Sequence, residues 1–423
     1  MVTLRVVDPI LNGPCACRSV RDSRSTRGSD AIAKTAFVST YPPQRCGIAT
    51  FTSDLAAAVG DREIVALQPP EKPGFYPVEV SRRIARDVPA DYLSAARWID
   101  ARPFAVVSLQ HEYGIWGGQD GAYVLDFVRA LRTPVVATLH TVLQSPTPSQ
   151  RRILSELVHV AAETVVMSAS AASLLTRSYG IDPARLEIVP HGVPQLPLVA
   201  PDTVKPQLGL TGHTVILSFG LLGPGKGYES AIAAMPAVVR ADPTALYVIV
   251  GATHPDLLRR EGESYRNRLA QLARSLGVAD RIRFVGRYVA ASELALWLAS
   301  ADIFVTPYPN LEQIVSGTLS YAMGAGKAIV STPYAYAAER LAEGRGRLVA
   351  AGSTDALAEG IIELALNAKL RAEHGRLAYE HSRGMHWPEV GASYRQLFAR
   401  IAAMPVQRSH VPVLADSLAV AGA

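Results

Sequence analysis

Cysteine, charge and long apolar runs are all scarce in this chain. Three cysteines occur among 423 residues, and two of them, Cys15 and Cys17, lie close to the N-terminus, so neither a disulfide framework nor a zinc-binding spacing follows. Charged residues make up 19% and apolar residues 49%, a composition too apolar for a disordered chain. No apolar run approaches the roughly 18 residues that a transmembrane helix needs. These absences exclude an integral membrane protein and suit a reducing cytoplasm.

The net charge of +5 is concentrated at one end of the sequence. Residues 1–34 hold six basic and three acidic side chains and so carry +3 of it, which leaves +2 for the other 389 residues. We therefore predict no nucleic-acid partner. An attraction of the Arg-rich start to an anionic membrane surface stays open, so the expected location is the cytoplasm or the inner face of the membrane.

Both ends of the sequence differ from its middle. Residues 1–34 are rich in Ser, Arg, Asp and Gly without a sustained apolar period, and they lack the apolar stretch of a secretory signal. We predict that this segment is disordered, although a start codon placed too far upstream would look the same. Residues 405–423 are predicted to be a loosely attached tail.

From Thr35 onward, short apolar runs alternate with helix-length segments. The expected strands are 36–40, 104–109, 134–139, 164–167 and 186–189 in a first series, and 214–219, 246–250, 282–284, 303–306 and 328–331 in a second. The expected helices include 49–59, 121–131, 149–162, 228–239, 265–276 and 293–299. A Pro-rich stretch, 190–206, separates the two series. The alternation predicts an α/β protein with two Rossmann-like, doubly wound parallel-sheet domains facing across a cleft.

Ligands of such sheets bind at the carboxyl ends of strands, so the loops there are the candidate sites. In the first expected loop, Gly47 beside a helix start lets a backbone amide approach a ligand, and Arg45 could reach an anion. An ordinary strand-to-helix turn is an equal alternative. The second loop, 110–121, combines His111, Glu112, Tyr113 and Trp116 with four glycines. Carboxylates and aromatic rings suit sugar recognition, whereas the aromatics could also merely fill the core.

Two histidines follow strands of the first series. His140 comes directly after a buried strand, where it can donate to, accept from or orient a hydroxyl. A core histidine with satisfied hydrogen bonds is the alternative. His191 lies next to the linker, which favours a structural role.

In the second series, glycines at 220, 223 and 225 expose amides between a strand and a helix, and Lys226 adds a positive charge. We interpret this turn as a diphosphate site, with a structural turn and a solvated lysine as the alternative. It is not a P-loop, because Gly227 stands where Ser or Thr would be required.

The last loop, 307–319, places Ser316, Gly317 and Thr318 at an expected helix start, where free amides and two hydroxyls can bind an anion. Glu312 beside it could bind sugar hydroxyls. A plain capping serine with a solvated glutamate is the alternative.

Taken together, these motifs resemble the retaining glycosyltransferases of family 4 (glycosyl transferases group 1), which have the GT-B fold. The resemblance extends from Ala36 to Ala403. It rests on the Gly47 loop, His140, and the segments 188–193, 220–227, 302–307, 312–326 and 387–390.

The resemblance implies a hexosyltransferase that takes a sugar from a nucleotide-diphosphate donor, retains its anomeric configuration and needs neither a metal nor another cofactor. It implies an acceptor-binding domain at 35–200, a donor-binding domain at 201–385, and a helix at 386–404 that crosses back to the first domain. His140, Lys226 and Glu312 would be catalytic. The donor would contact Gly47, Gly220, Gly223, Gly225, Arg287, Tyr308, Gln313, Ser316, Gly317, Thr318, Leu319 and Tyr321. The acceptor, a carbohydrate or a lipid-linked molecule, would contact Arg45, His111, Glu112, Tyr113 and Trp116.

Three departures mark a divergent branch. Leu221 stands where the family usually has an Arg, and Arg287 is our candidate replacement. The family's two glutamates lie eight positions apart, and here the pair is either Glu312 with Ser320 or Gln313 with Tyr321, so the second carboxylate is absent in both registers. His191 stands where Asn is common.

Three functions therefore stay open. We expect front-face glycosyl transfer in which the leaving phosphate takes the acceptor's proton, with GDP-mannose slightly favoured over UDP-glucose as donor. A GT-B-type phosphorylase or nucleotide-sugar epimerase is one alternative. A non-catalytic nucleotide- or sugar-binding protein is the other.

Overall fold

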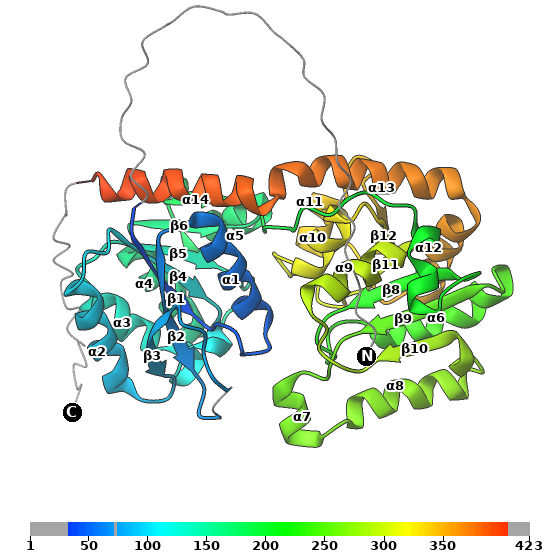
Figure 1. Ribbon diagram of the computed structural model, residues 1–423, viewed down its shortest axis with the longest axis horizontal. Coiled ribbons are helices and arrows are strands. Elements are labelled where there is room, and N and C mark those ends of the chain that lie inside the picture. Colours follow the sequence, from blue (N-terminus) through cyan, green and yellow to red (C-terminus); the bar gives the residue numbers. More distant parts are fainter. Residues whose placement is uncertain (1–32, 72–73, 405–423) are drawn as a thin grey trace, which may run out of the picture. The chain divides into compact units, whose positions relative to one another are not determined.

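A computed structural model of the chain describes residues 33–71 and 74–404 (Figure 1). The predicted disordered segment 1–34 and the tail 405–423 lie outside the described residues, apart from Ala33 and Lys34. Lys34 has a defined position, since its ammonium pairs with Glu63 at 2.7 Å and its carbonyl accepts from the amide of Ala105 at 2.9 Å.

The first domain is built on a seven-stranded, fully parallel sheet with the order β3-β2-β1-β4-β5-β6-β7. Its strands are β1 (Thr35–Ser39), β2 (Arg62–Gln68), β3 (Val80–Ala85), β4 (Val106–His111), β5 (Val135–Leu139), β6 (Glu163–Val166) and β7 (Leu186–Ile188). Its helices are α1 (Gly47–Val59), α2 (Pro89–Asp100), α3 (Tyr123–Ala130), α4 (Pro148–Val160) and α5 (Ala169–Tyr179), with short 3-10 turns η1 (Tyr113–Ile115), η2 (Gln119–Gly121) and η3 (Pro183–Arg185).

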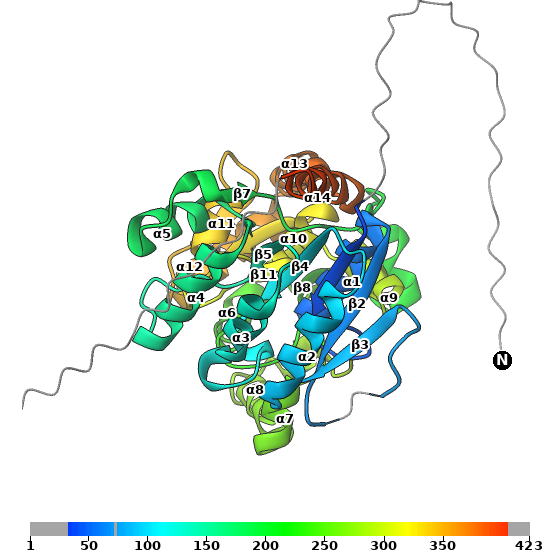
Figure 2. The ribbon, with the colours of Figure 1, turned by 90° about the vertical axis from the view of Figure 1, so that its left-hand side faces the viewer.

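Apolar residues cover both faces of this sheet, because both faces carry helices. In β1, Ala36 and Val38 pack with residues of α2, α3, α4 and α5, whereas Phe37 between them packs with α1 and the C-terminal helix α14 (Trp387–Ala402). The sandwich of two helical layers around the strands is visible in both ribbon views (Figure 1, Figure 2).

The second domain has a six-stranded parallel sheet with the order β10-β9-β8-β11-β12-β13. Its strands are β8 (Thr214–Phe219), β9 (Ala245–Val250), β10 (Ile282–Val285), β11 (Ile303–Thr306), β12 (Ala328–Ser331) and β13 (Arg347–Leu348). Its helices are α6 (Tyr228–Ala241), α7 (Pro255–Glu261), α8 (Ser264–Ser275), α9 (Ala291–Ser300), α10 (Gly317–Gly324), α11 (Ala335–Arg340), α12 (Thr354–Leu366) and α13 (Ala368–Ser382), with 3-10 turns η4 (Pro201–Thr203), η5 (Lys205–Leu208) and η6 (Ala279–Arg281). One core joins the sheet to α6, α8 and α12, and the other joins it to α9, α10, α11 and α13.

The predicted fold class is confirmed: both domains are doubly wound, parallel and of the Rossmann-like type. All ten predicted strands are found within two residues of their expected bounds. The prediction lacks three strands. β3 carries Arg82 and Arg83 at the sheet edge and β13 has two residues, so neither has an apolar run; β2 does have one, from Ile64 to Leu67, and the prediction omits it.

The chain passes from the second sheet back to the first through η7 (Arg383–Met385) and α14. Beside this return, Val193 donates its amide to the carbonyl of Met385 at 2.8 Å and accepts from the amide of Trp387 at 3.1 Å. Gly192 leaves room for the Trp387 ring, since a Cβ there would lie 2.2 Å from a ring carbon. The segment that leads from the first domain to the second, at Val193, and the segment that returns, at Met385 and Trp387, are therefore hydrogen-bonded to each other.

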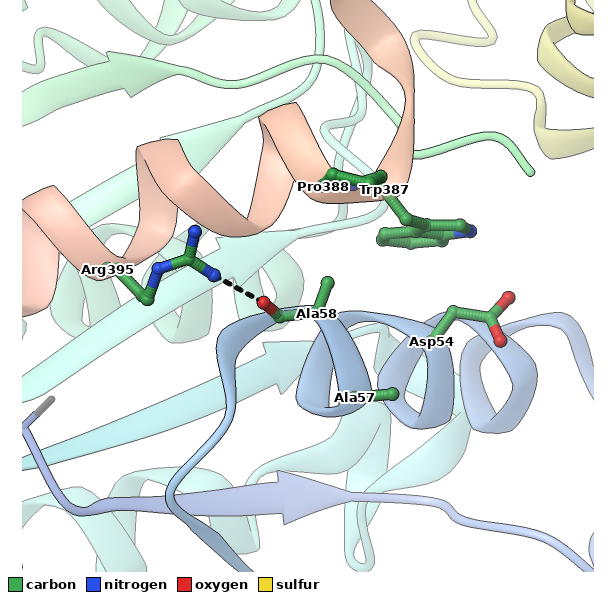
Figure 3. A pocket seen from close by; sticks show the side chains of 6 residues that line it. All are labelled: Asp54, Ala57, Ala58, Trp387, Pro388 and Arg395. Atoms are coloured by element: carbon green, nitrogen blue, oxygen red, sulfur yellow. Dashed lines mark hydrogen bonds between the residues drawn. The ribbon is translucent and has the colours of Figure 1, made fainter. Parts of the chain in front are cut away.

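Helix α14 then packs along α1, and the two helices lie side by side in both views (Figure 1, Figure 2). The guanidinium of Arg395 donates to the carbonyl of Ala58 at the end of α1 (Figure 3). From its inner face, Tyr394 makes a hydrogen bond of 2.9 Å to the hydroxyl of Thr138 in β5. Within residues 33–71 and 74–404, no helix is long and apolar enough to cross a membrane.

Candidate active site

Four of the predicted site loops follow the strands at which each sheet reverses its order, whereas His140 follows β5, the neighbour of β4. In the first sheet the reversal lies between β1 and β4, and in the second between β8 and β11. At such a point the connections leave in opposite directions and open a crevice at the carboxyl ends of the strands. We call the loops after β1, β4, β8 and β11 the switch-point loops.

In the second domain, the loop after β8 touches both β11 and α10. A Cβ at Gly227 (φ 72°) would lie 1.9 Å from the carbonyl oxygen of Pro307, so only glycine allows the loop to approach β11 so closely. A Cβ at Gly220 (φ 132°) would lie 3.4 Å from Cγ2 of Thr318 at the start of α10. Gly223 and Gly225 lie between these contacts; a Cβ at Gly223 would lie 3.9 Å from Cβ of His254, and Gly225 has open space around it.

The same loop brings Lys226 to the N-terminus of α10. Its ammonium lies 4.5 Å from the centre of the Tyr308 ring, and the Tyr308 hydroxyl is 2.8 Å from Oγ1 of Thr318. Ser316 caps the helix, since its hydroxyl accepts from the amide of Leu319 at 3.3 Å. A positive charge and a helix N-terminus thus converge, which is an arrangement that favours an anion.

His191 lies against this helix start. A Cβ at Gly317 would be 2.9 Å from Nε2 of His191, whose Nδ1 is 2.8 Å from the carbonyl oxygen of Gly192. Phe51 of α1 packs edge-on against His191 at 5.1 Å and against His140 at 4.8 Å between ring centres. A continuous aromatic contact therefore joins His140 of the first domain to α10 of the second. Sequence reasoning missed Phe51, because nothing in its helix marks it as different from a core residue.

His140 is held neutral. Burial, with smaller effects from His191 and His111, lowers its pKa to about 3. Its Nε2 lies 2.9 Å from Oε1 of Gln110. Burial likewise lowers the pKa of His191 to about 4. Both histidines are therefore neutral at neutral pH, and their polar contacts are hydrogen bonds without an imidazolium charge.

The loop after β4 is closed and tightly packed. His111 is fully buried and neither of its ring nitrogens has a partner in the described part of the chain, and burial lowers its pKa to about 4. The Trp116 indole donates to the carbonyl of Gln110 at 3.1 Å, and the Tyr113 hydroxyl donates to the carbonyl of Gln150 at 3.3 Å. These three side chains lie in the interior of the loop, as the core alternative of the sequence analysis described. Their acceptor-binding role stays a prediction.

Glu112 is the carboxylate of this loop. It accepts from the hydroxyl of Thr141 and from the amide of Tyr113, the latter at 3.0 Å. Burial raises its pKa, against the effect of these hydrogen bonds. The carboxylate thus ties the loop after β4 to the residue that follows His140.

Several polar contacts join the first domain to the second. Thr50 lies 3.3 Å from the hydroxyl of Tyr288, over whose ring the guanidinium of Arg45 sits at 5.8 Å. The Tyr321 hydroxyl donates to Asp54 at 3.2 Å, and burial raises the pKa of that aspartate. Gly47, at the start of the same helix, has open space around it.

A second set of such contacts lies around α5. The Glu339 carboxylate of α11 accepts from the amides of Ala169 and Ser170 at 3.1 and 2.9 Å, and from the Ser170 hydroxyl at 2.8 Å. Arg340 donates to the carbonyl of Met167 at 2.7 Å, and the Ser168 hydroxyl donates to the carbonyl of Ile314 at 2.9 Å.

Three of the predicted donor residues, Arg287, Leu319 and Gln313, and the predicted catalytic residue Glu312 have defined surroundings within the second domain. Arg287 makes a bidentate pair with Glu293 on the surface, at 2.8 and 2.5 Å, so its part in binding a diphosphate stays a prediction. Leu319 is fully buried. The amide of Glu312 donates to Asn310 at 3.0 Å, and the side chain of Gln313 donates to the carbonyl of Val315 at 2.9 Å.

The two possible glutamate registers differ in where their second member lies. Ser320 is fully buried and bonds the carbonyl of Ser316 and the hydroxyl of Tyr336. Tyr321 points instead toward Asp54, as described above. Of these two residues, Ser320 bonds within the second domain, whereas Tyr321 reaches a residue of the first domain.

Two hollows lie elsewhere. One of about 360 Å³ between α1 and α14 is lined by Asp54, Ala57, Ala58, Trp387, Pro388 and Arg395 (Figure 3). Another of about 680 Å³ is lined by Gln195, Tyr379, Arg383, Gly384, His386 and Glu389. No residue of a switch-point loop lines either hollow. The candidate site therefore rests on the convergence of the loops described above and not on either hollow.

Two parallel Rossmann-like sheets, with a lysine and a helix N-terminus meeting at the switch point of the second, define a protein of the GT-B class. Residues 47–195 match the family model "Glycosyltransferase Family 4", and residues 213–367 match "Glycosyl transferases group 1". The chain belongs to this glycosyltransferase family.

Among curated relatives, the D-inositol 3-phosphate glycosyltransferase of Actinosynnema mirum is 29% identical over 279 residues, which are 62% of this chain and 65% of the relative. The chain thus spans slightly less than two thirds of that relative. The phosphatidyl-myo-inositol mannosyltransferase of Mycolicibacterium smegmatis is 26% identical over 320 residues, 74% of this chain and 76% of the relative.

Solved structures share the fold at low identity. HepE of Anabaena, in complex with UDP and glucose, superimposes with a TM-score of 0.70 and 14% identity over 87% of this chain and all of that chain. Sucrose-phosphate synthase of Thermosynechococcus elongatus gives a TM-score of 0.70 and 17% identity over 86% of this chain and 99% of its own.

Proposed function

We propose that this chain is a retaining hexosyltransferase that moves a sugar from a nucleotide-diphosphate donor to an acceptor hydroxyl. The observation that carries the proposal is the convergence of Lys226 with the start of α10. A diphosphate bound there would be neutralised by one ammonium and by the free amides of Gly317 and Thr318. We propose that this ammonium and these amides neutralise it without a metal ion.

The main catalytic effect would be stabilisation of the leaving diphosphate. Fixed donors aimed at developing negative charge act strongly because they need no reorganisation. The bond between the anomeric carbon and the phosphate oxygen breaks while the acceptor oxygen attacks from the same face, and the acceptor's proton passes to the leaving phosphate. His140 is unsuited to take that proton, since a group with a pKa of about 3 is a weak base at neutral pH.

The donor and acceptor are proposed from chemistry and relatives. HepE is named as a complex with UDP and glucose, and the two curated relatives are named for inositol phosphate and for mannosyl transfer. We propose mannose from GDP-mannose, with glucose from UDP-glucose as the second candidate, and a hydroxyl of a carbohydrate or lipid-linked acceptor. The proposed location is the cytoplasm or the inner face of the membrane.

The test is a panel of nucleotides followed by a transfer assay. The true donor nucleotide should raise the melting temperature by mass action, and its sugar should appear on an acceptor. Lys226→Ala should lower kcat by about a hundredfold to a thousandfold. Lys369→Ala, on the exposed side of α13, is the matched control and should keep full activity. Unchanged turnover of every nucleotide sugar by Lys226→Ala would refute the proposal.

A non-catalytic binding protein is the second candidate. Two departures favour it: Leu221 stands where the family carries a phosphate-binding Arg, and Ser320 or Tyr321, according to the register, stands where it carries a carboxylate. Incubation with donor alone separates the two functions: an enzyme slowly releases free sugar, which mass spectrometry detects, whereas a pure binder releases none.

A further inference from the structure

Gln110, the residue before the end of β4, is a polar side chain with no exposed surface. Its Oε1 lies 2.9 Å from Nε2 of His140, and its Nε2 lies 3.4 Å from the hydroxyl of Ser108. Its backbone carbonyl accepts from the Trp116 indole. The amide is thus engaged at both ends, and its position does not depend on any ligand.

This contact selects one tautomer of His140. An amide oxygen can only accept, so the hydrogen of the neutral imidazole must lie on Nε2. The Gln110 amide has Oε1 toward His140 and its nitrogen toward the Ser108 hydroxyl, which can accept from it. With its single hydrogen on Nε2, His140 presents a lone pair on Nδ1.

Nδ1 is the free end of the ring. It has no hydrogen-bond partner among residues 33–71 and 74–404. Both ring nitrogens of His111 are buried without a partner, but Nδ1 of His140 is not one of these fully buried atoms. The side chain keeps 6% exposure. Phe51 of α1 faces one edge of the ring, and the titratable groups that act on it are His111 from β4 and His191 from the linker.

We propose that Gln110 is a positioning residue for His140: it fixes the Nε2–H tautomer and the ring orientation, so that Nδ1 accepts a hydrogen bond from a hydroxyl of the transferred sugar. The proposal rests on the proposed glycosyl transfer for its functional part. Its structural part, the tautomer, stands by itself.

The first test measures the tautomer in the full chain labelled with 15N-histidine, by long-range nitrogen–proton correlation. We expect His140 to carry its hydrogen on Nε2, assigned by comparison with His140→Asn. Gln110→Leu removes the acceptor and should give a mixture of tautomers, whereas Gln110→Glu should keep Nε2–H. Finding the Nδ1–H form in the unaltered protein would overturn the proposal.

The second test uses kinetics. Gln110→Leu should lower kcat by roughly tenfold or more, because a misoriented histidine loses a buried hydrogen bond, and should change KM little. Gln110→Glu should restore activity at pH 8 and lose it progressively toward pH 5, because the new carboxylate favours protonation of His140 and so removes the lone pair. The unaltered protein should lack this acid limb between pH 5 and 7. Equal pH profiles of the two proteins would contradict the proposal.

Thr138→Val is the matched control. Thr138 is the register partner of Gln110 in β5, and the substitution removes a buried hydrogen bond to Tyr394 of similar length. It should lower stability but leave the tautomer and the pH profile unchanged. If the unaltered protein transfers no sugar, the proposed function fails while the tautomer measurement still decides the assignment of Gln110. If Gln110→Leu does not fold, Gln110→Glu carries both tests.

Discussion

The two domains differ in charge and in packing at the carboxyl ends of their strands. In the first domain Gln110 and His111 are fully buried and Trp116 keeps 3% exposure, and both histidines that end β4 and follow β5 are neutral. In the second domain the loop after β8 is rich in glycine, exposed at Pro224 and Gly225, and carries a cation at Lys226. The first set is neutral and tightly packed, and the second is open and carries a positive charge.

This difference matches the parts that the two domains would take in the proposed transfer. A diphosphate needs positive charge and free amides, which a flexible glycine turn beside a helix start supplies. A sugar hydroxyl needs a lone pair or a donor held at one orientation, which a packed interior supplies. The predictions below test each half of the comparison in turn.

The largest effect on stability is expected from a side chain at the glycine turn. Gly227→Ala places a Cβ 1.9 Å from the Pro307 carbonyl in a left-handed conformation, so the turn must move away from β11. We expect a loss of about 3 kcal/mol or more in the free energy of unfolding. Gly225→Ala has open space and should cost only the left-handed penalty of roughly 1 to 2 kcal/mol. Denaturant titration compares the two, and equal costs would show that the turn is not held against β11.

The neutral histidines of the first domain predict acid lability. The folded chain keeps His111, His140 and His191 uncharged down to about pH 4 or 3, whereas the unfolded chain protonates them below about pH 6.5. The unfolded state therefore binds more protons in this window, and stability falls as the pH falls from about 6.5 to 4, by several kcal/mol in total.

His111→Leu isolates one of these groups. It removes two partnerless nitrogens, so stability at pH 7 should be equal or higher, and the loss toward pH 4 should shrink by about a third. Denaturant midpoints at several pH values measure both effects. His159→Leu, on the exposed side of α4, is the control and should leave the slope unchanged. If His111→Leu left the pH dependence of the unfolding free energy unchanged, this histidine would be charged in the folded protein.

A smaller effect is expected where the domains touch. Glu339→Gln weakens a carboxylate held by two amides and a hydroxyl at the start of α5, and should cost about 1 kcal/mol. Glu380→Gln, which loses only an exposed pair with Arg376, should cost less than half of that. Thermal unfolding compares the two variants. Identical midpoints would show that the hydrogen bonds of Glu339 to α5 do not stabilise the contact between the domains.

The smallest effect is expected from a chelator. If Lys226 and the α10 amides neutralise the leaving group, an excess of EDTA should leave the rate of sugar transfer unchanged. If EDTA abolished transfer and Mg²⁺ or Mn²⁺ restored it, the residues of the second domain would not be sufficient to neutralise the leaving group, and a metal ion would be required.

Much of this architecture could be predicted from the sequence, because buried parallel strands are short apolar runs followed by glycine, proline or polar residues. That signal located β8, β11 and β12 to the residue and placed Lys226 and Ser316 after them. It could not identify Phe51 or Gln110. Phe51 is an apolar residue on a helix and Gln110 a polar residue in a strand, and the contacts that distinguish them come from segments distant in the sequence. For the same reason it did not foresee that Arg287 has its own partner, Glu293, six residues away.

The contacts around Glu339, Ser168, Thr50 and Asp54 share one property: nearly every group in them is polar and would be hydrated if the domains separated. Water can replace such partners at little net cost, unlike the apolar cores of the two sheets. The exceptions are Ile314 and Val315, which pack against apolar clusters of the first domain, and the contact of Phe51 with His191. The boundary between the domains is therefore the place where the molecule can open while each sheet stays fully folded, as the proposed exchange of donor and nucleotide would require.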